Sequence, residues 1–400
     1  MGEKLQFKNE HELKLGHIKG DVKVENCRTI VPEKGKEIVI DGELFIREDT
    51  VIEGSLKAEY LEIDGRNTTE IHGDLVVTRS VRVKNGKLEI EGSATANKFD
   101  VGAALSVGKD LQASKVSIGG ALSVKGDATV EDINVGGAVK IEGKVDSKTI
   151  NVGGAVKCNT GTIGKVNVGG AFKAEGAVEI GDIDVGGAVV VGPGSKVLNI
   201  DVGGSFKSEG DLTFEMLDCG GAAKLGGKAT GRIVDVGGSV KAEASLVLAE
   251  NLDVGGSVVV NTDLIVAREI EVGGSLRAGN LIESPIIDIG GSIKGTRIKA
   301  VKEFRIGRRG EVSGFVESPD ITVSERVRGE SFYGDTIRVE ERARVKNLYG
   351  RVIYIERDVT IEGEVLYTES IEAESGVRFR KEPEQVKKLP NPDELVKRID

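Results

Sequence analysis

The dipeptide Gly-Gly returns every 16 to 18 residues through the middle of the chain, and this spacing constrains the fold more than any other feature. Each pair stands in a common phrase, which reads N-V-G-G-A-V-K at 134–140 and again at 151–157. A fixed period of this length is typical of a solenoid, in which each repeat buries its apolar face against its neighbours. The first glycines of the pairs are Gly119, Gly136, Gly153, Gly169, Gly186, Gly203, Gly220, Gly237, Gly255, Gly273 and Gly290.

Apolar and polar residues alternate around each glycine pair. In the phrase at 201–207, Val202 and Phe206 point to one side of the chain, while Asp201 and Lys207 point to the other. Alternation with a period of two indicates a half-buried strand. A helix with two glycines per repeat would lose about 2 kcal/mol. The sequence therefore predicts an all-β fold, a single-stranded parallel β-helix with about 17 residues per coil.

The same beat of inward aliphatic residues continues outside the Gly-Gly phrases, from Ile46 to Ile371, and predicts roughly twenty coils. We expect one continuous β-helical rod over residues 37–380, with the Gly-Gly zone at 99–294. Residues 1–36 are polar and broken by proline and glycine, which indicates a tail or an irregular cap.

Residues 381–400 form a charged tail with three prolines. Within it, Asn391 reads as a helix N-cap, followed by proline at the first helical position and an acidic first turn. Leu395, Val396 and Ile399 would give this short helix an apolar face. A two-turn helix is marginal alone, so we expect it to fray or to dock, for example over the last coil.

Composition bears on the partner and the compartment. The formal net charge is −10, which argues against a nucleic-acid-binding surface. The chain has neither a run of 18 apolar residues nor an apolar stretch near its start that would act as a secretory signal. Its three cysteines do not form a disulfide framework, and Cys219 replaces a core valine, so a buried thiol is expected. These features predict a cytoplasmic protein.

A solenoid turns each repeat position into a ladder, and the position two residues before the first glycine becomes acidic in seven consecutive repeats. Carboxylates on successive coils would lie about 4.8 Å apart, and each neighbouring pair would repel by roughly 1 kcal/mol. Two interpretations stay open: a plain solvated ladder, or a ladder that binds cations or a partner. The acidic residues are Asp184, Asp201, Asp218, Asp235, Asp253, Glu271 and Asp288, preceded by Asn134, Asn151 and Asn167.

Two further stripes follow from the repeat. The position four after the first glycine is basic in most coils, for example Lys140, Lys207 and Lys241, and could pair with the acidic ladder of a second rod. The outward glycines and the Ala or Ser that follows form a stripe of small side chains. This stripe is either a crowded corner that needs glycine or a flat track for a partner.

Arginine and aromatic residues increase after about residue 295, where the glycine pairs end. Four of the five tyrosines lie there: Tyr333, Tyr349, Tyr354 and Tyr367. These residues indicate either a wider core or a contact surface, because Tyr and Arg are enriched at interfaces.

The sequence gives no catalytic constellation, and we expect neither an enzyme nor a bound cofactor. Only His11, His17 and His72 are present, all outside the Gly-Gly zone. Carbohydrate-cleaving β-helices use an irregular carboxylate cluster, whereas the carboxylates here follow the repeat. No P-loop, dinucleotide fingerprint or zinc spacing occurs.

Three ordinary coils carry a phrase that resembles the repeat of the bactofilins, the polymer-forming cytoskeletal proteins. The phrase is Val or Ile, Glu, Gly, then Asp, Ser or Glu, at 49–58 and 358–365, and the copy at 70–77 has His72 in place of Glu. The layout, a β-helical core between short tails, is also similar. The resemblance implies nucleotide-free, end-to-end assembly into filaments, often at a membrane surface. This chain is several times longer than the typical family core.

Together these observations predict a structural protein whose main partner is itself, with the tails as further sites for partner proteins. A β-helix ends in unpaired strand edges, which template the addition of another strand. The expected assembly residues are Phe45 and Ile46 near one end and Tyr367 and Phe379 near the other. The alternative is a β-helical binding module that docks a partner through its ladders without polymerising.

Overall fold

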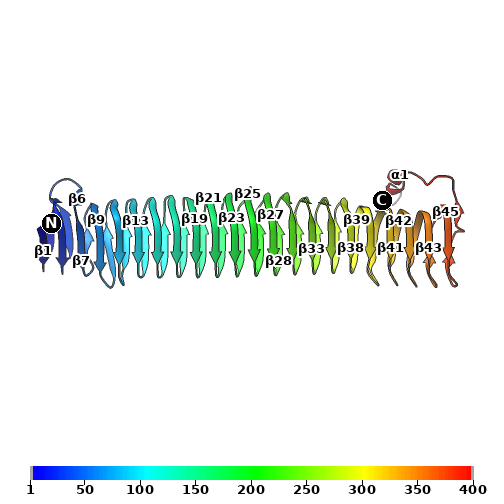
Figure 1. The fold of residues 1–400 in the computed structure, drawn as a ribbon, viewed down its shortest axis with the longest axis horizontal. Coiled ribbons are helices and arrows are strands. Elements are labelled where there is room, and N and C mark those ends of the chain that lie inside the picture. The colour runs from blue at the N-terminus through cyan, green and yellow to red at the C-terminus, as the bar shows by residue number, and fades with distance from the viewer. Residues whose placement is uncertain (1–2, 398–400) are drawn as a thin grey trace. The chain divides into compact units, whose positions relative to one another are not determined.

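The computed structural model describes residues 3–397 and is a parallel β-solenoid (Figure 1). About 22 turns follow one another at intervals of ~17 residues, and only 1% of the chain is helical. The predicted fold class is therefore confirmed. The chain divides into two compact units, Met1–Val197 and Leu198–Asp400, which are described separately.

In the first unit, each turn of the Gly-Gly zone consists of one long and one short strand. A representative turn has β17 (Ala128–Val135) and β18 (Ala138–Ile141), and β19 (Lys144–Val152) begins the next. β17 pairs in parallel with β15 (Leu111–Ile118) before it and with β19 after it. Inward residues stack on their equivalents, as Ile133 does on Ile150, and both are fully buried. The core is thus a column of aliphatic side chains, as the alternation predicts.

The strands of the first unit begin well before residue 37. β1 (Glu3–Lys8) pairs with β4 (Gly20–Glu25), and β2 (Glu12–Leu15) pairs with β5 (Thr29–Pro32). The tail or irregular cap expected over 1–36 is therefore replaced by solenoid turns across the described part of this segment, which raises the turn count above twenty. The physical reason is a short but regular alternation, with Leu13, Leu15, Val22 and Val24 pointing inward and buried.

In the second unit, the core of the C-terminal turns contains aromatic side chains. Phe304 on β39 (Ser292–Ile306) and Phe332 on β42 (Arg328–Val339) are both fully buried, with ring centroids 6.4 Å apart. These two rings are part of the aromatic enrichment seen in the sequence.

All three cysteines of the chain are buried, and burial raises the pKa of the Cys158 thiol to about 12.

The C-terminal tail contains the predicted helix, α1 (Pro392–Val396). The Asn391 side chain caps it, accepting a hydrogen bond from the Asp393 backbone N–H at 3.0 Å. Leu395 is only 2% exposed because it packs on Phe315 of β40 (Glu311–Glu317) and Tyr349 of β43 (Arg344–Ile355). The helix therefore docks on the side of earlier turns and not over the last one, which corrects that expectation. Ile399 lies outside the described residues.

Candidate functional site: the polar ladders beside the glycine pairs

The paired glycines form bends in which successive turns approach too closely for any side chain. A Cβ atom at Gly154 would lie 2.5 Å from the Gly137 carbonyl oxygen, and one at Gly238 would lie 2.2 Å from that of Gly221. The Gly154 N–H donates to the same Gly137 carbonyl at 2.8 Å. This contact supports the interpretation of the glycine stripe as a crowded corner, because backbone stacks directly on backbone there.

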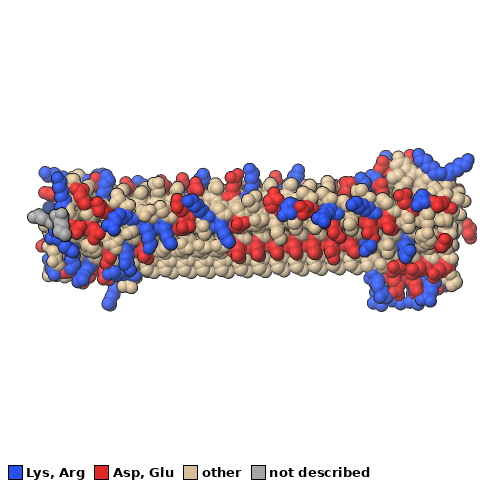
Figure 2. Space-filling model, viewed as in Figure 1, with Lys and Arg blue, Asp and Glu red and all other residues tan. Residues whose placement is uncertain are grey.

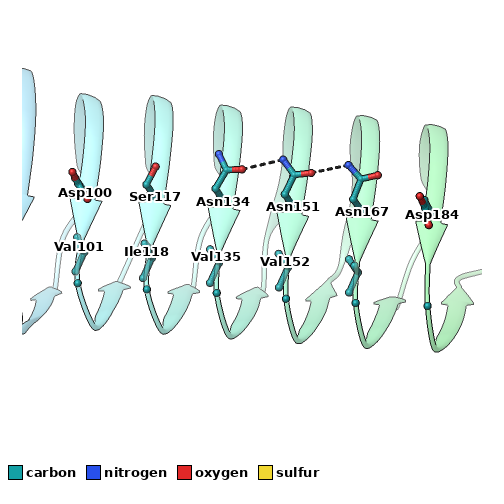
Figure 3. A pocket seen from close by; sticks show the side chains of 17 residues that line it. Asp100, Val101, Ser117, Ile118, Asn134, Val135, Asn151, Val152, Asn167 and Asp184 are labelled. Atoms are coloured by element: carbon teal, nitrogen blue, oxygen red, sulfur yellow. Dashed lines mark hydrogen bonds between the residues drawn. The ribbon is translucent and has the colours of Figure 1, made fainter.

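Next to these bends in the first unit lies an open groove, lined by the glycines and by one outward side chain per turn (Figure 3). The outward side chains are Asp100, Ser117, Asn134, Asn151, Asn167 and Asp184. Asn151 donates to the Asn134 side-chain oxygen at 3.0 Å, and Asn167 donates to that of Asn151 at 2.7 Å. Asn151 both donates and accepts, so the three residues form a hydrogen-bonded chain that runs in one direction, from Asn167 to Asn134.

In the second unit the same position is acidic on successive turns, in register from Asp218 through Asp235, Asp253 and Glu271 to Asp288. Figure 2 shows an acidic row beside a band without charged side chains. Burial, followed by repulsion from Asp235 and Asp201, raises the pKa of the Asp218 carboxyl. Repulsion from Asp253 is the main cause of the raised pKa of Glu271. At Asp218 and Glu271, repulsion between neighbouring carboxylates therefore acts in the folded state.

The cation-binding interpretation of this ladder stays a prediction. Asp184 belongs to the first unit, and the other six carboxylates belong to the second. Within residues 3–397, no group of three or more His, Cys, Asp or Glu side chains is arranged to hold a metal ion. Carboxylates on a strand ladder face the solvent side by side, which favours diffuse screening by cations over a closed coordination shell.

The basic ladder already has partners within its own unit. Lys140 contacts Glu142 at 2.5 Å, Lys207 contacts Glu209 at 2.8 Å, and Lys241 contacts Glu243 at 2.9 Å. The sequence analysis missed these ion pairs, although the spacing Lys-x-Glu that produces them is visible in the phrases K-I-E, K-S-E and K-A-E. Alternate residues of a strand point to the same side, which brings the two charges together.

Two of the histidines form surface pairs with carboxylates. His17 lies 2.8 Å from Asp41, and His72 lies 3.0 Å from Glu53 and 3.3 Å from Glu70. Hydrogen bonds to these two glutamates raise the pKa of His72.

The four predicted assembly residues fall in different places. Phe45 and Ile46 lie on β7 (Glu43–Arg47), which is paired on both sides, by β4 and β9 (Ser55–Asp64). Ile46 is fully buried, whereas Phe45 faces outward against Tyr60, with ring centroids 6.0 Å apart. They are therefore not at the first turn.

The other pair is closer to an end. Tyr367 on β45 (Val365–Ala373) and Phe379 on β46 (Arg378–Phe379) are half-buried and belong to the last turns of the second unit.

The molecule is thus a parallel β-solenoid, a fold compatible with β-helical repeat families. The chain matches no family model, no curated protein and no solved structure. Among the described residues, no helix is long and apolar enough to cross a membrane.

Proposed function

We propose that this protein is a structural, bactofilin-like protein that assembles end to end in the cytoplasm, without nucleotide, cofactor or catalytic activity. The observation that carries the proposal is the state of the two end turns. Leu5 and Phe7 stack on Val22 and Val24, which are fully buried, yet both are half-exposed themselves. Among the described residues, none covers the inward apolar column at the first turn.

The last turn of the second unit has the same character. Ile371 stacks on Ile353, and Phe379 stacks on Ile361. The two underlying isoleucines are fully buried, whereas Ile371 and Phe379 are half-exposed. Covering such side chains with another copy would remove apolar surface from water, which supplies about 25 cal/mol for each Å² buried.

The backbone favours the same arrangement. Among the described residues, β1, β2 and β3 (His17–Ile18) each pair with a strand on one side only. At the other end, β46 and β47 (Glu384–Gln385) also have a single partner each. Unpaired strand edges accept further parallel strands. Because the two ends differ, copies would join head to tail, and a junction of this kind propagates into a filament.

The resemblance of three coils to the bactofilin repeat supports this proposal independently of the end turns. Assembly through apolar surface and backbone edges also needs no phosphate-binding loop, consistent with the sequence. The junction that we propose lies at Leu5 and Phe7 in one copy and at Ile371 and Phe379 in the next. Of the assembly residues expected from the sequence, this junction retains Phe379, and it has Leu5 and Phe7 in place of Phe45 and Ile46.

The test compares two phenylalanines of the first unit. We expect Phe7→Lys to abolish or shorten polymers seen by negative-stain microscopy and light scattering, because it places a charge in the junction. Phe45→Lys is the matched control, since it adds the same charge to an outward, half-buried site on an interior strand. Circular dichroism should show intact strands in both variants.

Wild-type protein that stays monomeric across concentration, salt and temperature would overturn the proposal. That outcome would favour the alternative of a binding module, for which the open groove beside the Asn134–Asn167 chain is the supporting observation.

A further inference from the structure

One face of the second unit changes from charged to aromatic toward its C-terminal turns. A single outward row reads Glu283, Lys299, Glu317, Tyr333 and Tyr349 on successive strands. Glu283 and Lys299 form an ion pair at 2.9 Å, as expected for a solvated strand face. Tyr333 and Tyr349 continue the row with aromatic rings in place of charged side chains. An apolar patch of this kind is typical of a surface that contacts another segment.

The C-terminal segment of the chain covers this surface. Leu395 of α1 forms a buried cluster with Phe315 and Tyr349, and Leu389 and Val396 pack against its rim. At the edge of the cluster, the Arg297 guanidinium contacts the Asp393 carboxylate at 2.7 Å and the Glu317 carboxylate at 2.5 Å. Phe315, Tyr349 and Arg297 thus form a surface that we call the aromatic groove. It binds the apolar side chain of Leu395 and the carboxylate of Asp393.

The segment that carries Leu395 has few backbone hydrogen bonds to the rest of the second unit. In the described part of the tail, backbone hydrogen bonding to the solenoid ends at Val386, whose N–H donates to Tyr367 at 2.9 Å. Residues 387–391 then lead to α1, which is five residues long and too short to be stable unless docked. The proline at 390 and the one at 392 hold this connection extended.

We propose that the aromatic groove is an exchange site, in which the C-terminal segment of a second copy of this chain replaces the chain's own. The groove accepts residues 389–396 in one copy, so the identical residues of a second copy make identical contacts. Exchange costs only the opening of the connection and the entropy of association, because every contact that is broken is formed again. A reciprocal exchange gives a closed, two-fold dimer.

This dimer is distinct from the end-to-end junction and does not depend on it. The groove lies on the side of the second unit, whereas the proposed junction uses the end turns. A closed exchange stops at two copies, while head-to-tail stacking gives a series of masses. The background variant Phe7→Lys removes one half of the head-to-tail junction, so the two kinds of association are measured separately.

The test reverses the two charges in separate full-length chains. In Arg297→Glu the groove repels its own tail, and in Asp393→Arg the tail is repelled by its own groove. When the two variants are mixed, both exchanged pairings are matched, whereas both pairings within a chain are mismatched. We expect the mixture in the Phe7→Lys background to form a heterodimer of twice the 42.3 kDa chain mass in light scattering, while each variant alone stays monomeric.

Leu395→Lys supplies the control for the route of association. Introduced into both chains, this substitution removes the apolar side chain that packs in the groove and should abolish the heterodimer. Circular dichroism should confirm that the strands are intact. A mixture that contains only monomers would overturn the proposal. A heterodimer that survives Leu395→Lys in both chains would also overturn it, since the contact would then not involve α1.

Discussion

The run of asparagines in the first unit and the run of carboxylates in the second occupy the same position beside the same glycine bends, yet they behave in opposite ways. Asn134, Asn151 and Asn167 bind one another because Asn167 donates to Asn151 and Asn151 donates to Asn134. Asp218 and Glu271 have only acidic neighbours along the row, and their pKa values are raised. In a solenoid, the residue type at one repeat position therefore determines a whole row of contacts, because each side chain meets its own equivalent on both sides.

The largest expected effect is one that the two regions share. Gly154→Ala in the first unit and Gly238→Ala in the second each place a Cβ against a carbonyl oxygen, at 2.5 Å and 2.2 Å. Each substitution should lower the free energy of unfolding by about 1–3 kcal/mol, since the turns have to move apart. Urea unfolding measures the change. The neighbouring outward changes Ala155→Ser and Ser239→Ala should be nearly neutral, and equal midpoints for all four variants would refute the stacked bend.

The second effect separates the regions. Asn151→Asp removes the donor to Asn134 and brings a charge into the amide chain, so we expect a loss of about 1 kcal/mol in the free energy of unfolding. Asn159→Asp is the control, because Asn159 is exposed and lies outside the row. Thermal unfolding at neutral pH compares the two. If both variants melt alike, the asparagine chain has no part in stability.

The third effect has the opposite sign. Asp218→Asn should raise the free energy of unfolding by about 1 kcal/mol or less at pH 7, because it removes a charge that is disfavoured by partial burial and by the neighbouring Asp235 and Asp201. The pH dependence follows from the raised folded-state pKa of Asp218. Protonation stabilises the folded wild type as the pH falls through that pKa, and the gain is complete below the unfolded value of about 4.

The difference between Asp218→Asn and wild type should therefore shrink with falling pH and vanish near pH 3. Measuring both proteins at each pH cancels the groups with the opposite behaviour, such as Glu243, whose pKa is lowered by Lys241. A difference that is constant from pH 7 to pH 3 would contradict the assignment of the effect to the charge of the Asp218 carboxylate.

The smallest expected effect concerns cations. Millimolar Mg²⁺ or Ca²⁺ should raise the melting temperature by about 1–2 °C more than NaCl of matched ionic strength, because divalent ions screen a row of carboxylates more strongly. The double variant Asp218→Asn, Asp235→Asn should lose part of this response. Identical responses to the divalent and monovalent salts would leave ordinary screening as the whole effect.

Several features could be predicted from the sequence because they depend on near neighbours. The glycine spacing predicted the parallel solenoid, and the N-cap at Asn391 predicted α1, whose bounds agree with that signal. The core position of Cys219 followed from its place in the repeated phrase. By contrast, the strands before residue 37 were missed, because their alternation is interrupted by proline and glycine and lacks the repeated phrase.

The polar sites were less predictable. The acidic row was visible in the sequence, but the pairing of the basic row with Glu142, Glu209 and Glu243 was missed, because each lysine pairs with the residue two positions further along the chain and not with another ladder. Phe45 was placed at an end by its distance from residue 37, whereas the strand pairing places it on an interior strand.

By itself, the sequence determined the period, the direction of the strands, the stacking of like on like and the glycine bends. Each of these depends on contacts between one turn and the next, and every repeat forms such contacts in the same way. Only the tertiary structure decided where α1 docks, which aromatic side chains it covers, and which apolar residues the end turns leave exposed. The docking of α1 depends on a tail that folds back to Arg297, 96 residues before Asp393, and no repeated pattern encodes a contact that is made only once.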